Sequence, residues 1–439
     1  MAHDLYLRVY KKKSELVRPD GKAEVFLEGP MNAVARQRAK RIAATLSEGY
    51  LEKQILDCKE ATTAHSFSQL NDHHILLLDA LIKSVTSETG RALLALTIMQ
   101  LCIKSIAPDQ NIRLHKGGPN PSSFSWHDGI SMRSLDNNFI TPLLRRYELL
   151  KLNAHGFMMT RSLAENYPYS LVYKANIRGA RSEWAEIVEE VETGRMPAEP
   201  ALHWLLTQLL NQADAFKALS TEVLALLEGF LGAHQFIDHT KTEKLILHHV
   251  AQSNYAARLM EIAMHSLMQA MAECGVFGDA ELKPLSQMRS ANKKHGNVGD
   301  VELLEQGQII EAWDAKFGKS YLRDELEELA DKIPLHPDLK SVGFVTSGEP
   351  ERLDELALRL HDLGELFGVT PEILTFQTWV ERQFTRSIQD GSVSKSELSS
   401  NWLRAYVESL SLKRTDLAPI DEPCYQWLDA LKIILMTEQ

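Results

Sequence analysis

Cysteine is scarce in this sequence, and its scarcity excludes several kinds of site. Four cysteines occur among 439 residues, they lie far apart, and no two of them form a Cys-x-x-Cys pair. We therefore exclude a cysteine-ligated zinc site and a disulfide framework, and we expect a reducing compartment. The sequence also lacks a Gly-x-Ser-x-Gly nucleophile motif and a Gly-rich phosphate loop. It therefore offers no sign of a serine hydrolase or of an ATP-driven motor.

Long apolar runs are missing as well. No uncharged run approaches about 18 residues, the length that a membrane-spanning helix needs. The N-terminus has no apolar stretch followed by a small-residue cleavage site. We therefore expect a cytoplasmic protein that does not bind a membrane. The chain is long enough for two or three domains with real hydrophobic cores.

The acidic total hides a basic segment. Lysine and arginine number 48 against 59 acidic residues, a formal net charge of −11. Between Asn111 and Arg181, ten lysine and arginine residues face four acidic ones, so this segment carries +6. The remaining 38 basic and 55 acidic residues give −17. The segment is also rich in asparagine and aromatic residues, among them Trp126, Tyr169 and Tyr173.

These residue types favour contact with DNA. Arginine and asparagine read base edges, and lysine, arginine and tyrosine bind phosphates. A second basic stretch, residues 289–296, directly precedes Asp300. The residues that we expect to contact DNA come from these two stretches: Arg133, Asn137, Asn138, Arg145, Arg146, Lys151, Arg161, Lys293 and Lys294.

The spacing of apolar residues predicts a mostly helical α+β chain in three regions. Residues 1–110 are predicted as a helical N-terminal region and residues 111–195 as a DNA-binding domain. After a linker around 196–200, residues 200–439 mix strands with helices.

The DNA-binding region is predicted as a winged helix. A helix over 133–148 precedes two strand-like runs, 149–152 and 157–160, which are separated by a turn. Helices followed by a small β-hairpin are the ingredients of that module, and a basic winged helix reads DNA.

The third region contains a pattern of acidic residues that indicates metal chemistry. Asp300 lies in one predicted strand, 298–304, and Asp314 and Lys316 lie in the next, 307–318. Alternation along a strand puts Asp314 and Lys316 on the same face. If a tight turn pairs the strands, Asp300 lies beside Asp314. Two adjacent carboxylates repel unless a cation separates them, and Mg²⁺ suits that position.

This arrangement resembles the PD-(D/E)xK nuclease superfamily, the fold of most Type II restriction endonucleases, over roughly residues 240–350. The core of that family is a helix, a three-stranded meander, a helix and a last strand. These match the predicted elements 241–273, 276–289, 298–304, 307–318, 321–332 and 341–347. Gly299 stands where the family usually has proline.

The resemblance implies a Mg²⁺-dependent endonuclease. In such a site Asp300, Asp314 and the carbonyl of Ala315 would bind the metal. Lys316 would position the attacking water, and Glu261 on the first helix would assist. The resemblance also implies a prokaryotic Type II restriction enzyme. It would act as a homodimer on double-stranded DNA at a specific sequence, with a cognate methyltransferase protecting the host site.

Two alternatives remain open. A DNA-binding regulator with an inactive nuclease-like domain would share the basic segment but would not need Lys316. His361 and Asp362 resemble the motif of HD-type metal phosphohydrolases, for which His73-His74 or His248-His249 would supply a distant histidine. A zinc site among the histidines of residues 234–249 is disfavoured, because the spacing and the acidic neighbours of such sites are absent.

Overall fold

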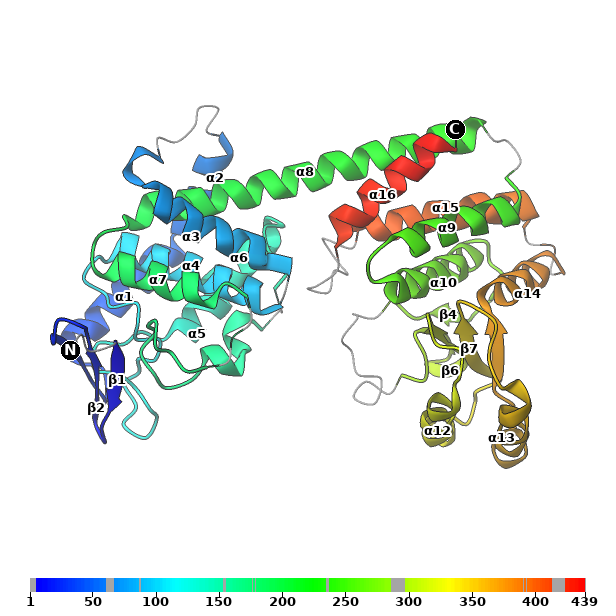
Figure 1. Cartoon of the computed structure of the whole chain (residues 1–439), viewed down its shortest axis with the longest axis horizontal. Coiled ribbons are helices and arrows are strands. Elements are labelled where there is room, and N and C mark those ends of the chain that lie inside the picture. The colour runs from blue at the N-terminus through cyan, green and yellow to red at the C-terminus, as the bar shows by residue number, and fades with distance from the viewer. Residues whose placement is uncertain are drawn as a thin grey trace. The chain divides into compact units, whose positions relative to one another are not determined.

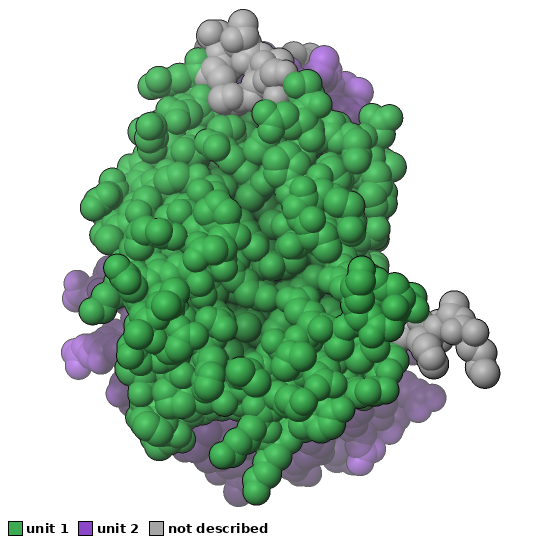
Figure 2. Space-filling model, turned by 90° about the vertical axis from the view of Figure 1, so that its left-hand side faces the viewer, with its two compact units in different colours: residues 1–215 green, residues 216–439 purple. Residues whose placement is uncertain are grey.

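The computed structural model shows an α+β chain, about 59% helical, that divides into two compact units (Figure 1). Unit 1 comprises residues 1–215 and unit 2 residues 216–439 (Figure 2). The predicted mostly helical α+β class is confirmed. The structure describes residues 5–60, 67–86, 88–152, 155–175, 177, 179–233, 237–285, 297–389, 391, 393–412 and 423–438. In these ranges no helix has the length and apolar character needed to cross a membrane.

Unit 1 is built around helices. Its α-helices are α1 Ala33–Ser47, α2 Tyr50–Glu60, α3 Asp72–Lys83, α4 Glu88–Ile106, α5 Met132–Leu135, α6 Thr141–Arg146, α7 Arg181–Glu192 and α8 Ala198–Ala233, whose second half belongs to unit 2. Short helical turns are η1 Phe67–Gln69, η2 Ser84–Thr86, η3 Asp136–Ile140, η4 Phe157–Met159 and η5 Arg161–Leu163. Helix α4 is apolar on all sides, and residues 91–103 are all buried. A helix of that kind belongs in the centre of a core.

A small sheet precedes these helices. Strands β1 Tyr6–Val9, β2 Lys13–Val17 and β3 Ala23–Leu27 pair antiparallel in that order. The prediction of a helical region is therefore wrong over residues 6–27. The inward-facing Leu16 and Phe26 are buried against Trp126. Because the strands have only four or five residues, their alternation is a short and weak signal.

The predicted hairpin of the winged helix is also wrong. Among the described residues, 149–152 pair with no strand, and Phe157–Met159 form the helical turn η4. The apolar residues on both sides of the predicted turn are buried in the same core: Leu149, Leu150, Leu152, Phe157 and Met158. A short apolar run that is buried on every side cannot be identified as a strand from its spacing. The Asp136 carboxylate accepts a hydrogen bond from the Met158 amide at 3.0 Å and so holds η4 against η3.

Unit 2 contains a five-stranded mixed sheet in the order β4-β5-β6-β7-β8. Its strands are β4 Glu281–Leu282, β5 Val301–Glu305, β6 Gln308–Lys316, β7 Ser341–Thr346 and β8 Glu372–Thr375. The first three form an antiparallel meander, and β7 and β8 continue parallel to β6. The predicted meander and last strand are therefore confirmed, with β4 as a two-residue first strand.

Helices cover both faces of this sheet (Figure 1). Helix α10 Ala256–Glu273 packs against β4, β5 and β6, and behind it lie α9 His239–Gln252, α15 Lys395–Leu412 and α16 Cys424–Thr437. On the opposite face, α12 Arg323–Lys332 and α13 Leu353–Phe367 contribute to a separate apolar cluster with Ala312 and Phe344. The turn η6 Ile333–Leu335 follows α12, and α14 Phe376–Gln389 follows β8.

Two predicted elements of unit 2 have different bounds in the structure. The helix expected over 241–273 is two helices, α9 and α10, because Tyr255 adopts a left-handed conformation with φ of 60°. The strand expected over 372–380 ends at Thr375, where α14 begins.

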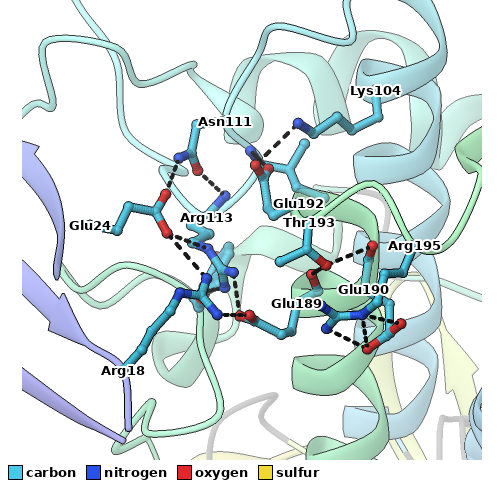
Figure 3. A network of polar contacts seen from close by, with 12 residues as sticks. Arg18, Glu24, Lys104, Asn111, Arg113, Glu189, Glu190, Glu192, Thr193 and Arg195 are labelled. Carbon is cyan, nitrogen blue, oxygen red and sulfur yellow. Dashed lines mark hydrogen bonds and ion pairs between the residues drawn. The ribbon is translucent and has the colours of Figure 1, made fainter. Parts of the chain in front are cut away.

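A network of charged residues fastens the small sheet to α7 (Figure 3). Arg113 is fully buried, and its guanidinium donates to the Glu189 carboxylate of α7 at 2.5 Å. Arg18, which directly follows β2, pairs with the other oxygen of Glu189. Glu24 of β3 lies 3.5 Å from Arg113. The small sheet, the segment around Arg113 and helix α7 are therefore joined through the Glu189 carboxylate.

This network predicts that unit 1 loses stability in acid. Burial acts to raise the pKa of Glu189, but Arg18 and Arg113 outweigh it and hold the pKa below its usual value. The stability that Glu189 contributes is therefore complete above the ordinary glutamate pKa and disappears as the pH falls through the lowered pKa. At neutral pH, Glu189→Gln should cost about 3–5 kcal/mol, because it leaves buried Arg113 with too little negative charge.

Urea unfolding at neutral and acidic pH measures this effect. The difference between wild type and Glu189→Gln should shrink as the pH falls. Glu60→Gln, at the exposed end of α2, is the control and should leave the unfolding midpoint unchanged. A constant difference at all pH values would contradict the assignment.

Candidate functional site

The hairpin β5–β6 brings the two predicted aspartates together. A two-residue turn, Gln306 and Gly307, joins the strands, and both residues have positive φ angles of 51° and 81°. Val301 lies opposite Trp313, and the Asp300 amide donates to the Trp313 carbonyl at 3.0 Å. Asp300 therefore lies directly beside Asp314 at the end of the strand pair.

Asp300 is the most perturbed acid of this site. Its carboxylate accepts a hydrogen bond from the Ala315 amide at 3.0 Å and shares a second one with Asp314. Burial raises the pKa of Asp300 well above its usual value, and the carboxylates of Asp314 and Glu261 raise it further. A proton or a cation therefore stabilises the pair.

Lys316 lies on the same face of β6 as Asp314, as alternation requires. Its ammonium is 2.9 Å from the Asp314 carboxylate and 5.7 Å from the centre of the Phe344 ring. Burial acts to lower the pKa of Lys316, but Asp314 and Asp300 outweigh it and raise the pKa above its usual value. Lys316 is therefore a fixed positive charge next to the acidic pair.

Glu261 reaches the same place from helix α10. The negative charge of its carboxylate helps to raise the pKa of Asp300. Arg258, one turn earlier on the same helix, donates a hydrogen bond to this carboxylate. Arg258 is buried, and Glu261 is mostly buried. The structure thus brings together all four predicted catalytic residues, Asp300, Asp314, Lys316 and Glu261, and Arg258 is an addition that the sequence patterns did not indicate.

A further buried acid fixes the backbone that precedes Asp300. The Glu302 carboxylate accepts hydrogen bonds from the amides of Val298 and Gly299 and pairs with Lys283 at 2.5 Å. Glu302 is almost fully buried. The sequence does contain a signal for Glu302, because an acidic residue at a core-facing position of a strand needs a specific partner.

Most of the predicted DNA-contacting residues lie on the surface of unit 1. Arg133, Asn137 and Asn138 are exposed on α5 and on the π-helical turn η3. Arg145 on α6 and Arg161 on η5 are exposed as well.

The other predicted contacts differ in their surroundings. Arg146 is exposed but pairs with Glu52 of α2, and Lys151 is half-buried. Lys293 and Lys294 lie outside the described residues.

The charge of the basic segment is only partly a surface charge. Arg113 belongs to the buried network, and Trp126, Tyr169 and Tyr173 are buried core residues. These aromatic residues therefore do not supply the exposed aromatic surface that the segment's composition suggested.

One pair of basic residues marks a positive position on this surface. Lys116 is half-buried, and its pKa is lowered by burial and by the nearby guanidinium of Arg133. Arg133 also donates to the Met158 carbonyl at 3.3 Å, which ties it to η4. A half-buried ammonium next to an exposed guanidinium favours an anion close to both.

The residues of the HD alternative have other surroundings in the structure. His361 and Asp362 are exposed on α13. Of the proposed distant histidines, His249 is buried between the Tyr406 hydroxyl and the Trp427 carbonyl, and His73 pairs with Glu186. In the described part of the chain, no group of three or more His, Cys, Asp or Glu residues could hold a metal ion by itself.

Comparison with known proteins adds no relative. No protein-family model matches this chain. A search of curated proteins also finds no match. Inferences about function therefore depend on the site itself.

The position of Asp300 depends on glycine at position 299. A Cβ atom at Gly299 would lie 2.7 Å from the Trp313 carbonyl oxygen, closer than real Cβ atoms approach backbone. Gly299→Ala should therefore push β5 away from β6 and destabilise the protein by about 1–3 kcal/mol.

Thermal unfolding of the variant provides the measurement. Gly348→Ala is the matched control, because a Cβ there meets open space and its φ is not positive. Equal melting temperatures for the two variants would show that the backbone at residue 299 can move without cost.

Proposed function

We propose that this protein is a Mg²⁺-dependent DNA endonuclease of the PD-(D/E)xK kind, most similar in type to Type II restriction enzymes. The observation that carries the proposal is the meeting of Asp300, Asp314, Lys316 and Glu261 at one end of a mixed sheet. Its antiparallel meander and parallel last strands follow the order expected of that family. An acidic pair beside a fixed lysine is the minimal set for metal-assisted hydrolysis of a phosphodiester.

The donor atoms present fit Mg²⁺. This ion takes oxygen ligands and is usually held by one or two carboxylates, with water and substrate phosphate completing the shell. Asp300 and Asp314 supply such carboxylates, so a third protein side chain is not required. Burial and the neighbouring carboxylates of Asp314 and Glu261 raise the pKa of Asp300, and this supports a cation beside the pair. The carbonyl of Ala315 would be a further ligand by the resemblance.

The residues of the chain then have distinct roles. A bound Mg²⁺ would polarise the scissile phosphate and stabilise the leaving oxygen. Asp300 and Asp314 would hold the ion, and Lys316 would orient the attacking water. Glu261, held by Arg258, would accept a hydrogen bond from a water molecule on the α10 side of the site.

The exposed basic residues of unit 1 support DNA as the substrate. Arg133 and Lys116 form a positive position suited to a phosphate, and Asn137 and Asn138 lie on the neighbouring turn. By the resemblance, we further propose a cytoplasmic prokaryotic enzyme that works as a homodimer, together with a methyltransferase that protects the host site.

Plasmid cleavage tests the proposal directly. Wild type should cut supercoiled plasmid with Mg²⁺ and should not cut it with EDTA. Asp314→Asn and Lys316→Met should each lower the cleavage rate by about 100-fold or more, because each removes a charge from the reacting centre.

Glu305→Gln and Lys340→Met form the matched control pair. These two residues also form an acid–lysine pair at 2.9 Å on this sheet, but the pair is exposed, and both variants should cut like wild type. Undiminished cleavage by Asp314→Asn and Lys316→Met would move the active site elsewhere. DNA binding without cleavage under any metal or methylation condition would instead support the regulator with an inactive nuclease-like domain.

A further inference from the structure

The small sheet of unit 1 has an outer face that the core does not cover. Residues directly opposite one another in antiparallel strands share a face. The register puts Arg8 opposite Glu15 and Glu15 opposite Val25, and it puts Lys13 opposite Leu27. Leu16 and Phe26, on the inner face, are buried. The first group therefore points away from the core.

This outer face carries large apolar side chains. Tyr10 is 44% exposed, Val25 51% and Leu27 50%. Val25 and Leu27 alternate on β3 and therefore share this face, so exposed apolar side chains lie beside its charged ones.

The same face is strongly basic. Lys11 and Lys12 are exposed at the tip between β1 and β2, where the Tyr10 amide donates to the Lys13 carbonyl at 2.8 Å. No acidic residue occurs between Leu5 and Ser14. Arg8, Lys11, Lys12 and Lys13 thus give four positive charges, and Glu15 is the acid that the register places among them.

Contacts within the sheet hold two of these cations in place. The Arg8 guanidinium lies 5.0 Å from the centre of the Tyr6 ring, and Arg8 donates to the Tyr6 hydroxyl at 2.6 Å. The Lys13 ammonium pairs with the Glu15 carboxylate at 2.6 Å and lies 4.9 Å from the centre of the Tyr10 ring. Among the described residues, the cations of this face that form no ion pair with Glu15 are therefore Arg8, Lys11 and Lys12. Long side chains that are already ordered lose less conformational entropy when they bind a ligand.

We propose that this outer face, formed by Arg8, Tyr10, Lys11, Lys12, Lys13 and Leu27, binds the phosphate backbone of double-stranded DNA. The choice of DNA rests on the proposed function. The charge complements a polyanion, and tyrosine hydroxyl groups are common donors to phosphate. The exposed leucine and valine would pack against the sugars. This surface is separate in sequence from the basic segment 111–181, and it gives unit 1 a second group of phosphate contacts.

The salt dependence of DNA binding tests the proposal. The full-length protein is titrated with a short labelled duplex of mixed sequence in EDTA, so that nothing is cut, at several NaCl concentrations. Each lost phosphate contact should reduce the slope of log K against log salt by about 0.9. The triple variant Arg8→Ala, Lys11→Ala, Lys12→Ala should therefore lower the slope by about 2–3 and weaken binding about 10-fold or more.

The control is Lys40→Ala, Lys53→Ala, Lys59→Ala, which removes the same charge from exposed positions on α1 and α2. It should retain most of the affinity and slope of wild type. If the two triple variants lowered DNA affinity and the salt slope equally, the proposal would be overturned, since net charge alone would then explain the weaker binding. The proposal would also be overturned if the Arg8, Lys11 and Lys12 variant kept the wild-type affinity for duplex DNA and lost affinity only for single-stranded RNA or for phosphatidylserine vesicles. Cleavage in Mg²⁺ is scored separately, so a protein that binds through this face but never cuts would refute the proposed function alone.

Discussion

The repulsion between the Asp300 and Asp314 carboxylates is the constraint on which the site in unit 2 depends. The register of β5 and β6 makes the two groups neighbours, in a place where water screens them poorly. The Ala315 amide and the Lys316 ammonium offset part of the negative charge, and Glu261 adds to it. The remaining negative charge is the reason why we propose a divalent cation at this position.

Sequence patterns predicted unit 2 well, and physical reasons explain both the success and the gaps. The strands around Asp300 and Asp314 carry clear apolar signals, and a positive-φ turn at Gln306 and Gly307 joins them. The sequence could not show Arg258, since its importance comes from burial next to Glu261. The break at Tyr255 was missed because a single left-handed residue interrupts an otherwise continuous helical pattern.

Unit 1 was predicted less well, because its function was inferred from composition. Composition counts charges without distinguishing buried from exposed ones. Arg113 contributes to the positive total of its segment, yet it is neutralised by Glu189 from α7, outside that segment. The apolar runs 149–152 and 157–160 predict a hairpin, although burial on all sides in a helical core gives the same pattern. Meanwhile the true sheet lies in the first 27 residues, where the strands are short.

The close approach of Gly299 to the Trp313 backbone has a consequence for finding relatives. No side chain fits at position 299 without displacing β6, so a protein with this same close approach of the two strands must keep glycine there. The turn between the strands imposes a second glycine, Gly307, whose φ is positive. A search pattern of Gly-Asp, a central glycine and Asp-x-Lys at these spacings is therefore more selective than the acidic residues alone.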